Sequence, residues 1–170
     1  MNRIIFWLLC VLLLPLSSAC NDTDDVEEIF TGKTWRLTFI NDGNSYGWYH
    51  FPNVNGDHLM AYDPVHGKRI FTVDFSGSAS AGLIDGTFKA KGSVNMDGGW
   101  RANGKTNDFM TEVRSKKVVD SSDPLAEIIA EGLTNATSYR GDSKNLYLRY
   151  TYRNPKTGKI VELQMAFTAK

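Results

Sequence analysis

Cysteine is scarce in this sequence of 170 residues, which contains only Cys10 and Cys20. With so few cysteines the chain has no disulfide framework, and its fold must depend on a hydrophobic core. A surplus of either charge is also lacking, because 19 basic residues balance 19 acidic ones. Proteins that bind nucleic acid neutralise its phosphates with a basic surface. We therefore expect no nucleic-acid partner.

Long apolar runs are lacking as well, apart from one at the start of the chain. Residues 4–16 are almost wholly apolar, a run of 13 residues, which is short of the ~20 that span a bilayer with ease. The run follows the basic Arg3 and precedes the small residues 17–19. This order is typical of a secretory signal peptide. We predict that residues 1–19 are a signal peptide.

Cys20 closes the segment Leu-Ser-Ser-Ala-Cys at residues 16–20. This segment resembles the lipobox of bacterial lipoproteins, in which the signal is cut just before a cysteine whose thiol carries a diacylglycerol. The resemblance implies lipidation of Cys20 and attachment to a membrane. We expect a cell-envelope protein, lipid-anchored at the outer membrane and either periplasmic or exposed on the surface. Since Cys10 is then removed, no cysteine pair remains for a disulfide.

The residues directly after Cys20 are acidic and polar. We predict that residues 20–29, which include the lipidated cysteine, form a solvated tether. Such an acidic stretch is also similar to the signal that sends lipoproteins of the Bacteroidetes to the cell surface. The folded domain is then expected over residues 30–170.

Period-two alternation of apolar and polar residues dominates from residue 34 onward, which predicts antiparallel strands with one buried face. The predicted inward sets are Trp35, Leu37 and Phe39; Phe71, Val73 and Phe75; Phe88, Ala90, Gly92 and Val94; Leu146, Leu148, Tyr150 and Tyr152; and Val161, Leu163, Met165 and Phe167. Short glycine-containing segments at 85–86, 97–99 and 103–104 indicate turns. Residues 154–158 indicate a hairpin loop that pairs the last two strands.

One segment has helical spacing instead. Leu125, Ile128, Ile129 and Leu133 recur on one face, and Asp123 and Pro124 suit an N-cap and a first helical position. An amphipathic helix packs its apolar face onto a sheet or plugs a barrel end. The predicted fold class is α+β, mainly antiparallel β, with a small curved sheet or open barrel and one packed helix.

Three stretches of the chain resemble the META family of envelope domains. They are residues 30–37, with Gly32, Trp35 and Leu37; residues 85–100, with Gly92, Asn95 and Trp100; and residues 125–148, with the helix and a closing Leu-x-Leu strand. The META cysteines are missing, as in similar Bacteroidales lipoproteins of uncharacterised function. The resemblance implies a curved sheet or open barrel with one helix, and no enzyme activity.

An insert at residues 46–68 carries most of the candidate functional residues. Tyr46, Trp48 and Tyr49, together with Trp100, form the predicted binding surface, because aromatic rings on a wet face stack on sugars or on partner proteins. The alternative is that these rings close the core of a small domain. The two interpretations stay open at this point.

The histidines of the insert, His50, His58 and His66, lie eight residues apart. Metal sites more often use tight spacings, so we predict exposed loop histidines and no metal site. The small-residue segment 76–82 matches neither a nucleophile elbow nor a phosphate loop. We therefore predict no catalytic residues and no cofactor.

The resulting hypothesis is a non-catalytic cell-envelope lipoprotein, a monomer that binds protein or carbohydrate. The alternative is a carrier of a small apolar ligand in a barrel-like cavity. A cavity requires small inward side chains, whereas the predicted inward positions are large: Trp35, Phe39, Phe75, Phe88 and Phe167.

Overall fold

The computed structural model describes residues 22–45, 47–80 and 83–170, and most of them lie in one antiparallel sheet. Its strands are β1 (Thr34–Asn41), β2 (Thr72–Ser80), β3 (Leu83–Lys91), β4 (Val94–Asn103), β5 (Phe109–Val118), β6 (Ala136–Gly141), β7 (Asn145–Arg153) and β8 (Ile160–Ala169). The helices are α2 (Asp22–Phe30), α3 (Gly56–Met60) and α4 (Leu125–Thr134). Among the described helices, none combines the length and the apolarity that crossing a bilayer requires.

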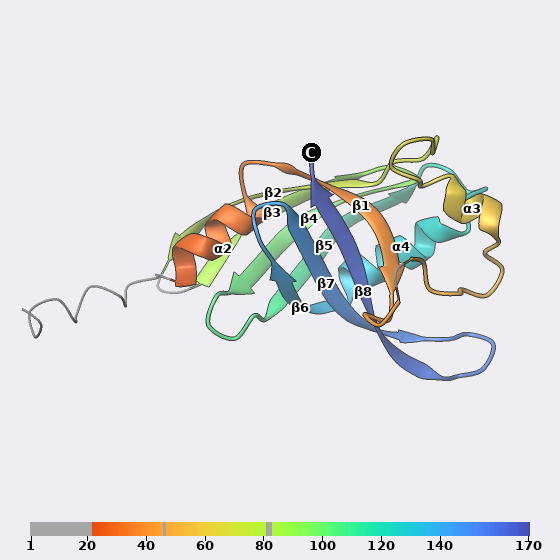
Figure 1. Cartoon of the computed structure of the whole chain (residues 1–170). Helices are drawn as coiled ribbons and strands as arrows, with labels where there is room; N and C mark the ends of the chain where they lie inside the picture. Colours follow the sequence, from red (N-terminus) through yellow and green to blue (C-terminus); the bar gives the residue numbers. More distant parts are fainter. Residues whose placement is uncertain (1–21, 46, 81–82) are drawn as a thin grey trace, which may run out of the picture.

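The eight strands follow the order β5-β4-β3-β2-β1-β8-β7-β6, and the sheet curls into a half-barrel (Figure 1). The two edge strands approach each other, since Asp108 and Ser138 form a bridge and the Tyr139 amide donates to the Asn107 carbonyl over 2.9 Å. The predicted fold class is therefore confirmed. Hairpins join most neighbouring strands of the sheet. The pairings of β1 with β2 and of β1 with β8 join strands that lie farther apart in the sequence.

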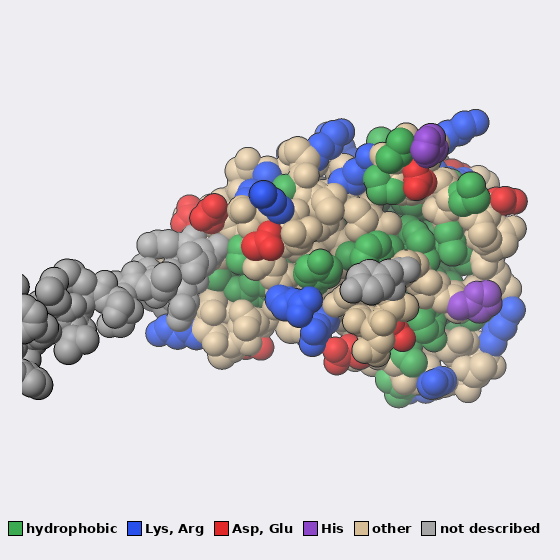
Figure 2. All heavy atoms as spheres, in the orientation of Figure 1, with side chains coloured by type: hydrophobic (Ala, Val, Ile, Leu, Met, Phe, Trp, Pro, Cys, Tyr) green, Lys and Arg blue, Asp and Glu red, His purple; other side chains and the backbone are tan. Residues whose placement is uncertain are grey.

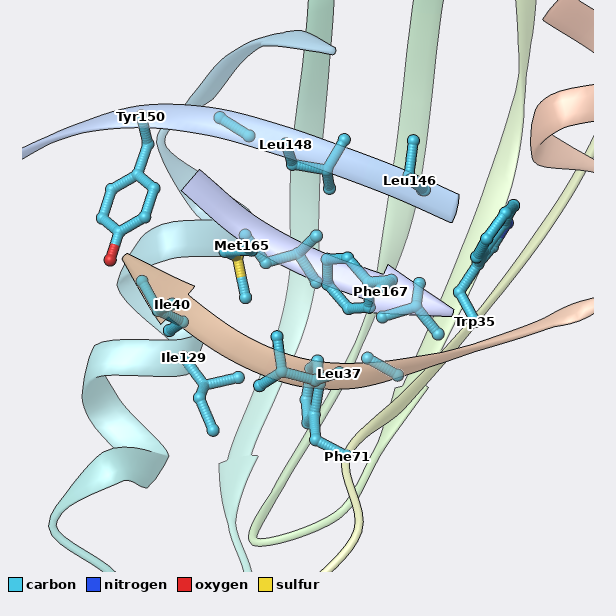
Figure 3. Packing of buried hydrophobic residues seen from close by; sticks show 14 of the residues in the cluster. Trp35, Leu37, Ile40, Phe71, Ile129, Leu146, Leu148, Tyr150, Met165 and Phe167 are labelled. Carbon is cyan, nitrogen blue, oxygen red and sulfur yellow. The ribbon is translucent and has the colours of Figure 1, made fainter. Parts of the chain in front are cut away.

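The core fills the concave face of the sheet (Figure 3). Leu37, Leu148 and Met165 come from three neighbouring strands, and Ile129 of α4 closes the space opposite them. All four side chains are at most 1 % exposed. The period-two pattern thus identified the buried face of most strands, because alternate side chains of a strand point to opposite sides.

The prediction for Phe39 is wrong. The pairing of β1 with β8 shifts register between Leu37 and Phe39, which is a β-bulge that adds one residue to β1. Alternation therefore changes phase at this point, so that Phe39 is half-buried and Ile40 is fully buried.

Two of the predicted turns are also wrong. The glycines at 85–86 lie inside β3 and those at 97–99 inside β4, while the strand predicted over residues 88–94 divides at Gly92 and Ser93. A Cβ on Gly86 would lie 1.9 Å from the Ser76 carbonyl oxygen, and one on Gly98 would lie 2.1 Å from that of Glu112. These glycines permit close approach of the neighbouring strand backbones, a role that strand glycines often have. The turn at 103–104 and the hairpin loop at 154–158 are confirmed.

The tether predicted over residues 20–29 is corrected from residue 22 onward by α2, a helix docked on the domain, and residues 20 and 21 lie outside the described residues. Val26 is 3 % exposed and Phe30 is fully buried. The Phe30 ring centroid lies 4.7 Å from that of Trp100, 5.2 Å from Phe75 and 5.4 Å from Phe109. The spacing of Val26, Ile29 and Phe30 is that of one helical face, a signal that is short and easily hidden in an acidic segment.

Helix α4 matches its prediction closely. Leu125, Ile129 and Leu133 are fully buried, and the Asp123 carboxylate accepts a hydrogen bond from the Leu125 amide over 3.1 Å. The predicted start is wrong by one residue, since the helix begins at Leu125 and its N-cap is Pro124 in place of Asp123. Gly132 lets the helix approach the sheet, because a Cβ there would lie 3.1 Å from the Tyr150 ring.

Candidate binding groove

The insert folds over one end of the half-barrel between β1 and β2. Arg36, on the outer side of β1, donates to the carbonyl oxygens of Pro64 and Asp63 over 3.0 and 3.4 Å. Phe51 and Tyr62 are buried, each 1 % exposed. The insert is therefore a packed part of the domain, held by its own apolar anchors.

A groove of about 820 Å³ lies between the insert and β1. Its lining consists of Thr38, Trp48, Asp57, Leu59, Met60, Ala61, Asp63, Pro64, His66, Gly67 and Lys68. Figure 2 shows hydrophobic side chains gathered on this face between β1 and α3, with histidine and acidic side chains beside them. The lining combines apolar side chains with charged ones, as many binding sites do.

The predicted aromatic surface is divided by the structure. Trp48 lines the groove and is half-buried, with its ring 5.7 Å from the Tyr62 ring. Tyr49 is half-buried outside the groove, 5.1 Å from Phe51, ring to ring. Trp100 follows the core interpretation and not the surface one, because its side chain is 3 % exposed in the aromatic cluster around Phe30.

Two other predicted site residues, Tyr46 and Cys20, lie outside the described residues. The indole N–H of Trp100 donates to the Ser76 carbonyl over 3.1 Å, so its polar atom is used within the fold. Among the members of the predicted aromatic set that the structure describes, Trp48 alone lines the groove.

A polar network, here named the insert latch, fastens the insert to the loops that precede β4 and α4. Its members are Tyr62, Arg69, Ser93, Asp120 and Asp123. The Tyr62 hydroxyl donates to the buried Asp123 carboxylate and lies 3.1 Å from the Ser93 hydroxyl. Arg69 donates to Asp120 over 2.7 and 3.1 Å. Burial raises the pKa of Tyr62, and the hydrogen bond to Asp123 adds to the increase, so this hydroxyl stays protonated and donating.

Residues 21–167 match the sequence family described as a domain of unknown function, DUF4847. The chain belongs to the DUF4847 family. The matched region begins directly after Cys20 and includes α2. No curated protein matches the chain. The relation to the META family stays a prediction.

A solved structure supports the fold of this DUF4847 domain. The crystal structure of a DUF4847 family protein from Bacteroides vulgatus ATCC 8482 aligns with a TM-score of 0.50 at 23 % sequence identity. The alignment covers 84 % of this chain and 96 % of that one. At this identity the likeness shows a shared fold and leaves the function of both proteins open.

Two titratable side chains of the insert, Asp63 in the groove and His58 outside its lining, have structural tasks in the DUF4847 domain. The backbone amides of His66 and Val65 donate to the Asp63 carboxylate over 2.7 and 2.9 Å and hold its pKa below the ordinary value. His58 caps α3, where its Nδ1 accepts from the Asn55 amide over 3.2 Å. No group of three or more His, Cys, Asp or Glu side chains within the described ranges is placed to hold a metal ion.

Sequence reasoning missed much of the apolar lining. Leu59, Met60 and Pro64 stand in a polar insert without helical or strand periodicity, so no pattern marked them. Met60 is 71 % exposed and nearby Val65 is 80 % exposed. Two large apolar side chains left in water within six residues are the signal that points to this surface.

Proposed function

We propose that this DUF4847 protein is a non-catalytic lipoprotein of the cell envelope, anchored at the outer membrane through Cys20, that binds another protein in the insert groove. The observation that carries the proposal is the half-buried Trp48 beside the exposed Met60 in a groove of about 820 Å³. Tryptophan is enriched among the residues that dominate interface energies. Methionine adapts its shape to a partner surface.

A protein partner fits this surface better than a sugar. Sugar recognition needs polar groups that bond hydroxyls, whereas one oxygen of the Asp63 carboxylate already accepts from two backbone amides and the Thr38 hydroxyl donates to the Ala166 carbonyl over 2.9 Å. Two apolar side chains outside the groove lining are also exposed, Val65 by 80 % and Ile70 by 43 %. Exposed apolar side chains near a groove suit the apolar centre of a protein interface.

The membrane anchor has its own support. The segment before Cys20 has the order of a lipoprotein signal, and the family match begins at residue 21. Mass spectrometry of the native protein tests this part directly. We expect an acylated Cys20 at the new N-terminus, and an unmodified thiol would overturn the placement.

The alternative of an apolar-ligand carrier is less well supported. Trp35, Phe88 and Phe167, which face inward in the half-barrel, are each at most 2 % exposed and pack in one cluster. Large side chains thus occupy the described interior positions that a barrel ligand would need. A small apolar probe that binds the purified domain and is unaffected by groove substitutions would revive this alternative.

The binding proposal is tested by two alanine substitutions of exposed methionines. Met60 lies in the groove, whereas Met110 on β5 is 53 % exposed and lies outside it. A lipid-free domain is used to capture partners from envelope extracts, and the affinity of each purified partner is then measured. We expect Met60→Ala and Trp48→Ala each to weaken binding roughly tenfold, and Met110→Ala to leave it unchanged.

Three results would count against this proposal. Equal affinity of the Met60→Ala variant and the unsubstituted domain would exclude the groove. Equal losses from Met60→Ala and Met110→Ala would indicate a general effect. Competition by oligosaccharides that abolishes capture would indicate a carbohydrate site instead.

A further inference from the structure

The docked helix α2 sets the distance between the lipid and the domain. Cys20 precedes the first residue of α2 by two positions, so the chain between them reaches at most about 7 Å. At the other end of the helix, Phe30 is fully buried in the aromatic cluster. The Thr31 amide then donates to the Glu27 carbonyl over 2.9 Å, and Thr31 bridges to Phe75 of β2. The helix is therefore attached to the sheet by packing and by backbone pairing.

Other parts of the molecule share the end that carries α2. Val26 and Ile29 of α2 line a shallow hollow with Gly104 and Asn107 of the β4–β5 turn and with Gly141 at the end of β6. Figure 1 shows α2 at one end of the half-barrel and α3 at the opposite end. A lipid attached just before α2 brings this end close to the bilayer.

The groove lies at the opposite end, and β4 connects the two. The strand begins next to Ser93, which the Tyr62 hydroxyl of the insert latch contacts, and it ends at Asn103, at the turn beside α2. Its ten residues span about 30 Å at the usual rise of a strand. The insert is thus separated from the α2 end by the length of the half-barrel.

We propose that α2 acts as a rigid spacer that orients the domain, with the β4–β5 and β6–β7 turns facing the lipid headgroups and the insert groove pointing away from the membrane. This inference rests on the proposed lipidation of Cys20 and goes further, since a flexible tether would leave the domain free to rotate. In this orientation the α2 end of the domain faces the bilayer, and the groove at the other end faces the protein partner.

The test uses the scarcity of cysteine. In the lipidated mature protein Cys20 is acylated, so one introduced cysteine is the only thiol open to a fluorophore. Lys105 in the β4–β5 turn and Lys68 on the groove rim are both exposed, and Lys105→Cys and Lys68→Cys form a matched pair. Each labelled protein is reconstituted into phosphatidylcholine–phosphatidylglycerol vesicles that carry a headgroup quencher.

We expect quenching several-fold greater at position 105 than at position 68. A control chain with 20 Gly and Ser residues inserted between Asn21 and Asp22 should lose most of this difference, because a chain of that length is flexible. This control leaves the docked helix and the core intact. A Phe30→Ala variant that still folds should likewise reduce the difference by releasing α2.

Vesicle flotation separates the two proposals. Flotation with equal quenching at both positions, or with a difference that the inserted spacer does not change, overturns the orientation alone. Greater quenching at position 68 also overturns it. Failure of the lipidated preparation to float overturns the proposed anchor, and the orientation with it.

Discussion

At the residue scale, the glycines of β3 and β4 matter because they have no Cβ atom. Gly77 of β2 pairs with Gly86 of β3, and Gly86 pairs on its other side with Trp100. The absence of side chains lets neighbouring carbonyls come closer than a Cβ permits. We therefore expect the curl of the sheet, and with it the enclosure of the aromatic cluster, to depend on these positions.

A pair of glycine substitutions tests this role. Gly86→Ala places a Cβ 1.9 Å from the Ser76 carbonyl oxygen, so the backbone must shift, whereas the nearest atom to a Cβ on Gly99 lies 3.7 Å away. We expect Gly86→Ala to lower the free energy of unfolding by about 2–4 kcal/mol and Gly99→Ala by less than about 1 kcal/mol. Urea denaturation followed by circular dichroism measures both, and similar losses would contradict the argument.

At the element scale, the insert depends on long-range contacts for its shape. Helix α3 has five residues and buries none of them, and a helix of that length is unstable by itself. Phe51, Val54 and Tyr62 supply the buried side chains that hold the insert against the half-barrel. The insert latch adds hydrogen bonds to the loops before β4 and α4.

Two tyrosine-to-phenylalanine substitutions separate the latch from simple packing. Tyr62→Phe leaves the buried Asp123 carboxylate without its hydroxyl donor, whereas the buried Tyr150 hydroxyl has no hydrogen-bond partner among the described residues. We expect Tyr62→Phe to cost about 1–3 kcal/mol of unfolding free energy, and Tyr150→Phe to be neutral or stabilising. Thermal and urea denaturation measure the difference, and equal effects would mean that the latch contributes little.

At the scale of the whole molecule, several exposed aspartates are tied to the fold. The pKa of Asp142 is lowered chiefly by the Lys144 amide, that of Asp42 by the Asn44 amide, and that of Asp120 by Ser122 and then Arg69. Glu131 differs, because burial raises its pKa. Among these four carboxylates, three have a lowered pKa and one has a raised pKa.

The stability of the domain is therefore expected to fall in acid. A carboxyl whose folded pKa is lowered stabilises the fold above its unfolded pKa, near 3.8, and this stabilisation disappears as the pH falls through the folded value. Glu131 acts with the opposite sign and partly offsets the loss. We expect the urea midpoint to be nearly constant from about pH 7 to 5 and to drop below about pH 4.

An Asp120→Asn variant provides the check on that cause. It should lower the midpoint at neutral pH and narrow the gap between the midpoints at about pH 6 and 3. If the difference between the two urea midpoints is unchanged, Asp120 does not contribute to the loss of stability in acid.

Local sequence pattern was sufficient to predict many of the strands, one hairpin loop and the helix α4. Alternation along 146–152 and 161–167, the hairpin loop at 154–158 and the helix at 125–133 were all predicted from neighbouring residues. Each depends on interactions within a few positions or on one repeating period. The lipobox-like segment that ends at Cys20 is also a contiguous pattern, and lipidation there stays a prediction.

Tertiary structure alone decided the remainder, because burial depends on what packs against a residue from far along the chain. The bulge in β1 buries Ile40 in place of Phe39. Gly86, which the sequence pattern placed in a turn, lies within β3 and pairs with Gly77 of β2. Docking of α2 brought Phe30 onto Trp100, which withdrew that indole from the surface. The groove exists only because the insert folds back over β1.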